Sequence, residues 1–101
     1  MVEVNLMNQI LIEKLNELKN IHIIDIRSQV KYEEGHILNA INIPKNNLMS
    51  SPDAYLSKDT KYYIYCDLGI ISREVCVNLD ELGYDVINLI GGYKRWLEAN
   101  K

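Results

Sequence analysis

Short runs of β-branched and apolar residues alternate along this chain with stretches in which apolar residues recur at helical spacing. The clearest runs are residues 21–26, 61–66 and 86–90, and buried strands of parallel sheets have this composition. Between the last two runs, apolar positions within 75–82 lie on one face of a predicted helix. Strands that alternate with helices predict an α/β fold, in which helices cover both faces of a mostly parallel sheet.

Weaker signals complete the expected order of elements. Residues 2–6 alternate apolar and polar side chains, which predicts a short edge strand. Asn8 is a suitable cap for an amphipathic helix that spans Ile10 to about Leu18. The other expected elements are a turn with a short helix within 28–35, a strand at 40–43 ended by Pro44, helical turns near Leu48 and Tyr55, a helix end at Gly83, and a final helix after Gly91-Gly92.

Length and composition exclude several classes of protein. A chain of 101 residues fits one domain, 1–101, and 48% hydrophobic residues suit a folded protein. The net charge of -3 is spread without a basic stripe, so no nucleic-acid partner is expected. The sequence has no apolar run of membrane-spanning length and no signal-peptide pattern, so we expect a cytoplasmic protein without a membrane partner. Two cysteines, Cys66 and Cys76, are too few for a zinc site, and both are expected to be free thiols.

Cys66 stands where chemistry is expected in an open α/β fold. It ends one predicted strand, and the residues after it lead into the next helix. A helix N-terminus offers unpaired backbone N–H groups that stabilise an anion such as a thiolate or a persulfide. Gly69 suits a curled loop because glycine tolerates positive φ. A free cysteine at the end of a strand is also a common core residue, and placement alone leaves both interpretations open.

Three groups of residues, taken in order, resemble the rhodanese family along nearly the whole chain. They are Asp25-Ile26-Arg27 with the stretch Tyr32 to Pro44 that contains Gly35-His36-Ile37; Tyr63-Ile64-Tyr65-Cys66 with Gly69 and Ser72; and Leu82-Gly83-Tyr84-Asp85-Val86 with Gly91-Gly92 and Trp96. The resemblance implies a rhodanese-like three-layer fold, with about five mostly parallel strands and helices on both faces.

The same resemblance implies a sulfurtransferase in which Cys66 takes up a sulfane sulfur. The thiolate would attack the outer sulfur of a donor, and an acceptor would then remove that sulfur from the persulfide. The donor would be a small sulfur compound or a persulfide-carrying protein, and the acceptor a thiol or a cyanide-like nucleophile. No cofactor and no metal are implied, because sulfur itself forms the covalent intermediate.

The loop departs from the family pattern in its charge. Family loops often carry Arg or Lys beside the cysteine and Arg before the helix serine, whereas this chain has Asp67 and Ile71. The expected backbone cradle for an anion consists of Asp67, Leu68, Gly69, Ile70, Ile71 and Ser72. A carboxylate beside a thiolate disfavours its charged form and repels dianionic thiosulfate, which is therefore expected to be a poor donor. Arg73 is the nearest cation in sequence and a candidate to replace the missing charge.

Two alternative functions use the same fold. The related cysteine phosphatases need Arg at the sixth residue after the cysteine, and that position is Ser72 here, so phosphatase activity is not expected. A binding or regulatory module is the stronger alternative. In that case Leu68, Ile70 and Ile71 would contact a protein partner, because clustered exposed aliphatic residues often mark contact sites.

Three further residues near the motifs have simpler expected roles. Asp25 ends a strand near the loop and is a supporting candidate for the site. Arg27 is expected to pair with Glu33 or Glu34. Cys76 shares a helix face with apolar residues and is expected to be part of the core rather than a second reactive thiol.

Overall fold

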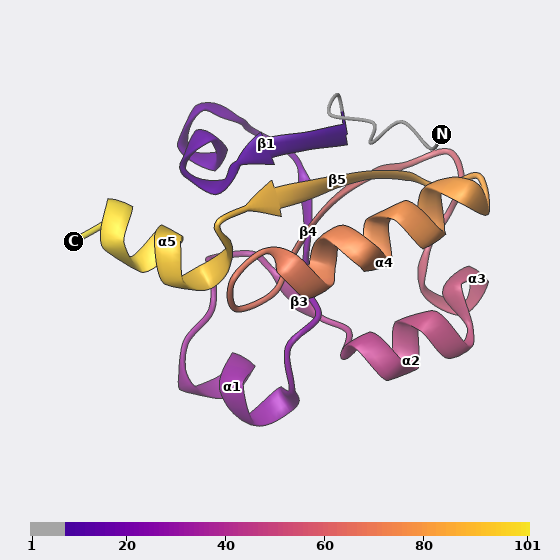
Figure 1. Cartoon of the computed structure of the whole chain (residues 1–101), viewed down its shortest axis with the longest axis horizontal. Coiled ribbons are helices and arrows are strands. Elements are labelled where there is room, and N and C mark those ends of the chain that lie inside the picture. Colours follow the sequence, from indigo (N-terminus) through magenta and orange to yellow (C-terminus); the bar gives the residue numbers. More distant parts are fainter. Residues whose placement is uncertain (1–7) are drawn as a thin grey trace.

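A computed structural model describes residues 8–101 of the chain, and the strand expected at 2–6 lies outside these residues. The elements in order are the strand β1 (Gln9–Leu11), the 3₁₀ helix η2 (Ile12–Glu17), β2 (His22–Asp25), α1 (Gln29–Glu34), β3 (Ile41–Asn42), α2 (Lys45–Ser50), α3 (Pro52–Tyr55), β4 (Lys61–Tyr65), α4 (Ile70–Glu81), β5 (Asp85–Ile90) and α5 (Gly92–Ala99). Figure 1 shows the path of the chain through them.

The strands form one five-stranded sheet in the order β1-β5-β4-β2-β3. Every neighbouring pair is parallel, and the register aligns Ile64 of β4 with Ile24 of β2 on one side and with Asn88 of β5 on the other. The expected mostly parallel sheet is therefore confirmed. β4 lies in the middle, so the residue that follows it emerges at the centre of one sheet edge, where parallel strands end together.

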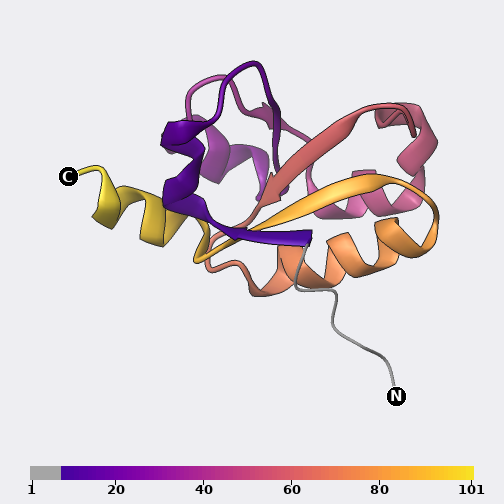
Figure 2. The same ribbon diagram turned by 90° about the horizontal axis from the view of Figure 1, so that it is seen from above.

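Two cores lie on the two faces of the sheet, because successive side chains of a strand point to opposite faces. In β2, Ile24 belongs to the core under α2 and α4, whereas Ile23 belongs to the core under η2, α1 and α5. Figure 2 shows η2 and α4 on opposite sides of the sheet. Helices on both faces complete the predicted three layers.

The helix expected from Ile10 to Leu18 is only partly correct. Residues Gln9–Leu11 instead form β1, which pairs in parallel with the free edge of β5, and Ile10 aligns there with Leu89. The chain then turns into the 3₁₀ helix η2, whose buried residues are Ile12 and Leu15. A spacing of three residues fits a 3₁₀ helix as well as an α-helix. Asn8 caps no helix, and its side-chain amide instead donates to Asp80 Oδ1 at 3.4 Å.

The helix α4 ends as its sequence predicts. Gly83 has φ 95°, a left-handed conformation that glycine adopts without strain. Its N–H donates to the Asp80 carbonyl at 2.9 Å, and the Tyr84 N–H donates to the Leu79 carbonyl at 3.0 Å. This pair of bonds satisfies carbonyl groups at the helix end and returns the chain to the sheet as β5. Among residues 8–101, no helix is both long enough and apolar enough to cross a bilayer.

Candidate active site

Cys66 directly follows β4 and lies beneath a short loop that leads into α4. Gly69 has φ 85° and precedes the helix, which begins at Ile70, two residues earlier than the loop boundary expected from the sequence. The curl of the loop brings two backbone donors to the sulfur. The N–H groups of Gly69 and Ser72 donate to Cys66 Sγ at 3.2 and 3.3 Å. Two N–H groups at a helix N-terminus suit a sulfur atom that carries negative charge.

A chain of buried polar side chains continues from the sulfur toward β5. The Cys66 thiol donates to Ser72 Oγ at 3.2 Å, and the Ser72 hydroxyl donates to Asn88 Oδ1 at 2.6 Å. The Asn88 amide nitrogen donates to the carbonyl of Gly69 and to Gln9 Oε1, each at 3.3 Å. Asn88 was not identified from the sequence. A lone asparagine within an otherwise apolar buried strand is the signal that could have marked it, because a buried amide requires hydrogen-bond partners.

The N-terminus of α5 holds the loop from its other side. The backbone N–H of Tyr93 donates to the Cys66 carbonyl at 2.9 Å, and that of Lys94 donates to the Asp67 carbonyl at 3.1 Å. Gly92 lies so close to these carbonyls that a Cβ atom there would be 2.5 Å from the Asp67 oxygen. The Gly91-Gly92 pair thus allows α5 to support the loop after Cys66 through backbone contacts.

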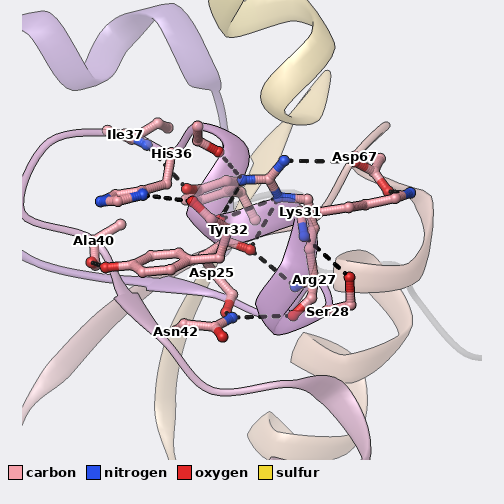
Figure 3. Close-up of polar contacts among 12 residues, drawn as sticks. Asp25, Arg27, Ser28, Lys31, Tyr32, His36, Ile37, Ala40, Asn42 and Asp67 are labelled. Carbon is pink, nitrogen blue, oxygen red and sulfur yellow. Dashed lines mark hydrogen bonds and ion pairs between the residues drawn. The ribbon is translucent and has the colours of Figure 1, made fainter.

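Asp25 and Arg27 form a buried ion pair at the ends of the strands beside the loop (Figure 3). Arg27 Nη2 lies 2.7 Å from Asp25 Oδ2, and the same nitrogen donates to the Gly35 carbonyl at 2.7 Å. The guanidinium also lies 4.2 Å from the ring centre of Tyr93. Burial disfavours the charge of Arg27, but its hydrogen bonds and attraction to Asp25 outweigh that cost and raise the pKa of the guanidinium.

The expected pairing of Arg27 with Glu33 or Glu34 is wrong. Both glutamates are exposed on α1, whereas the Arg27 side chain is buried and meets the carboxylate of Asp25 two residues earlier. A planar guanidinium matches a carboxylate with two parallel hydrogen bonds, which favours this local partner. Asp25 is therefore placed in a structural ion pair that reaches the edge of the site.

Asp67 is paired with cations that the local sequence does not show. Lys31 Nζ, from α1, lies 2.7 Å from Asp67 Oδ2, and Arg27 Nη1 lies 3.8 Å from Asp67 Oδ1 (Figure 3). Lys31 is 36 residues away in sequence, so only the fold brings it to the loop. Arg73, the candidate named from the sequence, is exposed on the first turns of α4, and no ion pair of Arg73 is found among residues 8–101.

The rim of the loop is apolar. Leu68, Ile70 and Ile71 have exposed fractions of 54%, 66% and 49%, whereas Cys66 beneath them exposes 5%. The sulfur is therefore nearly covered, whereas the aliphatic side chains of the loop are open to solvent.

Cys76 has the core position that its helical spacing predicts. It is a buried free thiol on the inner face of α4. Burial, and to a smaller extent the neighbouring Cys66, raise the pKa of Cys76 from the ordinary 9.0 to about 12. A thiol that stays protonated up to such a pH is a poor nucleophile.

Comparisons with known proteins agree with this fold. The family described as the rhodanese-like domain matches residues 8–99. The putative sulfurtransferase YtwF of Bacillus subtilis is 33% identical over 84 residues, which cover 83% of this chain and 81% of the relative. The thiosulfate sulfurtransferase GlpE of Coxiella burnetii is 36% identical over 84 residues, which cover 82% and 78%. The crystal structure of a rhodanese-like domain protein from Staphylococcus aureus is 32% identical, has a TM-score of 0.78, and covers 89% of this chain and 91% of that one.

Proposed function

The chain belongs to the rhodanese-like domain family, two of its matched relatives are named a putative sulfurtransferase and a thiosulfate sulfurtransferase, and from this premise we propose that Cys66 carries sulfane sulfur as a persulfide. The observation that carries the proposal is the pair of backbone N–H groups, from Gly69 and Ser72, that point at Cys66 Sγ. Their bonds to sulfur need no cation and remain available whether the sulfur is a thiolate or part of a persulfide.

The reaction consists of two displacements at sulfur. The Cys66 thiolate attacks the outer sulfur of a donor, a bond forms between the two sulfurs, and the donor leaves with the electron pair of its broken bond. With thiosulfate the leaving group is sulfite; with a persulfide it is a thiolate. A thiol or cyanide then attacks the outer sulfur of the Cys66 persulfide and restores the thiolate. A reducing compartment such as the cytoplasm suits this chemistry, because it keeps Cys66 in its thiol form.

We further propose that thiosulfate is a poor donor, even though one matched relative is named a thiosulfate sulfurtransferase. Asp25, Arg27, Lys31 and Asp67 pair with one another, so the charges beside the loop balance. A small dianion finds no unpaired cation among them. Polysulfides and protein persulfides carry less concentrated charge, and the aliphatic rim of Leu68, Ile70 and Ile71 suits them better.

Mass spectrometry after exposure to a polysulfide, and then to cyanide, tests the proposal. We expect one added sulfur atom on the peptide that contains Cys66, its loss with cyanide, and stoichiometric formation of thiocyanate. Cys66→Ser is the matched control, because it keeps a small polar side chain but cannot form the persulfide. Sulfur found only on Cys76, or on neither cysteine, contradicts the proposal.

The second candidate function is a binding module on the same fold, and the exposed Leu68, Ile70 and Ile71 favour it. The two functions differ in what the rim does. In a sulfurtransferase, Ile70→Ser keeps most of the transfer from polysulfide to cyanide, because Cys66 and the backbone N–H groups that bind its sulfur are unchanged. A wild-type protein that takes up no more sulfur than Cys66→Ser favours the binding module.

A further inference from the structure

Three buried polar groups link the reactive sulfur to the sheet. Cys66, Ser72 and Asn88 expose 5%, 0% and 2% of their surfaces. They come from the end of β4, the first turn of α4 and the middle of β5, and hydrogen bonds of 3.2 and 2.6 Å join them in that order. This series of hydrogen bonds either only stabilises the fold or also controls whether Cys66 is a thiol or a thiolate.

Asn88, the last residue of this series, fixes the direction of its hydrogen bonds. The amide nitrogen of Asn88 faces the backbone carbonyl of Gly69, which can only accept a hydrogen bond. The amide oxygen must therefore face Ser72 and accept the proton of its hydroxyl. A hydroxyl has one proton, so Ser72 presents only lone pairs to Cys66 while this bond is made.

A lone pair on the Ser72 oxygen accepts the proton of a Cys66 thiol but repels the negative charge of a thiolate. When Cys66 ionises, its S–H bond breaks, the proton passes to a solvent base, and the electron pair stays on sulfur without any change of oxidation state. The thiolate then faces the lone pairs of Ser72 unless the hydroxyl turns toward it, which breaks the bond to Asn88. An amide oxygen takes up no proton at neutral pH, so Asn88 does not act as a base.

We propose that Asn88 is a positioning residue that keeps the Ser72 hydroxyl turned away from sulfur, and that this hydroxyl turns to Cys66 when the thiolate forms. Asn88 thereby sets how readily Cys66 ionises, although it does not touch the reacting atoms. The inference concerns the same sulfur as the proposed persulfide chemistry and rests on that role for Cys66.

Other charged groups lie around Cys66 and stay unchanged in the variants, among them Arg73 and Glu74, which are exposed on α4 directly after Ser72. Asp67 on the same loop is paired with Lys31 of α1 and Arg27, Lys94 follows the N-terminus of α5 that holds the loop, and the raised pKa of Cys76 keeps the buried thiol of α4 neutral. None of these groups is altered by substitution of Ser72 or Asn88.

The test is the pH dependence of alkylation of Cys66, resolved from Cys76 by peptide mapping, in Ser72→Ala, Asn88→Ala and the double variant. Asn88→Ala frees the Ser72 hydroxyl to donate to the thiolate, so we expect the profile to move to lower pH by about one unit. The same substitution added to Ser72→Ala is expected to move nothing. Equal shifts in both backgrounds, or a shift to higher pH, overturn the proposal.

Two further measurements separate this role from a structural one. Val86→Ala also removes a buried side chain from β5, and it should lower stability without moving the alkylation profile. If Asn88→Ala does not fold, the wild-type protein still gives an answer by carbon NMR. The side-chain carbonyl of Asn88 should shift at the same pH as alkylation of Cys66, while that of Asn42, whose amide bonds the Asp25 and Arg27 carbonyls, should not. A constant Asn88 signal overturns the proposal, and neither readout depends on sulfur transfer.

Discussion

The individual residues that contact the Cys66 sulfur are neutral hydrogen-bond donors and acceptors. Gly69 and Ser72 supply backbone N–H groups to Cys66, whereas the nearby charged side chains bind one another. Lys31 and Arg27 both approach Asp67, which is about half exposed. The effect of a unit charge at such a rim is moderate, about 1 kcal/mol, because solvent screens it. We therefore expect single substitutions of these charged residues to change which sulfur donor the protein prefers.

Asp67→Arg is expected to improve the use of thiosulfate. The substitution removes the partner of Lys31 and leaves an excess of positive charge beside the loop, so transfer from thiosulfate to cyanide should rise several-fold, up to about tenfold. The gain should shrink at high ionic strength, and transfer from a polysulfide should change less. Lys31→Ala is the matched control and should lower thiosulfate use. Equal rates for wild type and Asp67→Arg with thiosulfate would show that rim charge does not select the donor.

Cys76→Ala is expected to leave sulfur transfer nearly unchanged and to lower the free energy of unfolding by about 1 kcal/mol through lost packing. Urea denaturation and a transfer assay check the two parts. A collapse of transfer at unchanged stability would show that Cys76 takes part in the chemistry.

The raised pKa of Cys76 adds a pH dependence. Because its pKa is higher in the folded chain, 9.0 becoming about 12, the stability that comes from the neutral thiol is complete below pH 9 and is lost as the pH rises toward about 12. Between these values the wild-type protein should lose more stability than Cys76→Ala. Identical slopes for the two proteins in denaturation at several alkaline pH values would contradict this.

The sequence could predict the residues that depend on local pattern but not those that depend on tertiary contact. Cys66, Gly69 and Ser72 lie within seven residues, so their loop was predictable from spacing. Lys31 reaches Asp67 across 36 residues and Asn88 reaches Ser72 across 16. These partners are set by strand order and helix placement, which local spacing does not specify.

Secondary-structure elements also differ in how far their own sequence predicts them. The strands β2, β4 and β5 form from short apolar runs and the helix α4 from apolar residues at helical spacing, so their sequences predict them close to their observed bounds. The segment Gln9–Leu11 forms a strand where the sequence predicts the start of a helix, because its apolar spacing fits a helix and a strand alike. What decides its structure is the free edge of β5, with which it pairs. A short segment thus takes the structure that its neighbour in space provides.

The contact between α5 and the loop after Cys66 can be tested by a substitution at Gly92. Gly92→Ala places a Cβ atom 2.5 Å from the Asp67 carbonyl oxygen and 2.7 Å from that of Cys66, so the loop must move. We expect sulfur transfer to fall about tenfold or more, because small displacements of reacting groups are costly.

Gly83→Ala is the matched control for this substitution. It also introduces alanine at a positive φ, but the new Cβ atom meets only the flexible side chain of Lys58, at 3.6 Å or more. It should cost about 1–2 kcal/mol of stability and retain transfer. Equal losses of transfer in Gly83→Ala and Gly92→Ala, measured with a polysulfide donor and cyanide, would indicate a general effect of strain.

The whole molecule contains two cores that share one sheet. Each strand in the middle of the sheet contributes alternate side chains to both cores, so neither core can lose its packing while the sheet remains intact. Trp96, the single tryptophan, lies against the core under η2, α1 and α5, whereas Val75 of α4 lies in the other core. This arrangement predicts that the chain unfolds as one cooperative unit.

Coincident unfolding of the two cores is the expected result in urea. Trp96 fluorescence reports on one core and far-ultraviolet circular dichroism on the whole chain, and their midpoints should agree. Val75→Ala alters the core that lacks Trp96, yet it should lower both midpoints equally and cost about 1–3 kcal/mol. Two separated transitions would contradict a single domain.

The backbone bonds from Tyr93 and Lys94 to the Cys66 and Asp67 carbonyls have a consequence during synthesis. The ribosome releases the cysteine first and the helix that secures its loop about thirty residues later, since nascent chains emerge from the N-terminus. Until α5 has emerged, the Cys66 and Asp67 carbonyls lack these two bonds and β5 has no helix after it. We therefore expect Cys66 to become competent for its proposed chemistry only when α5 has joined the fold, rather than gradually as the polypeptide lengthens.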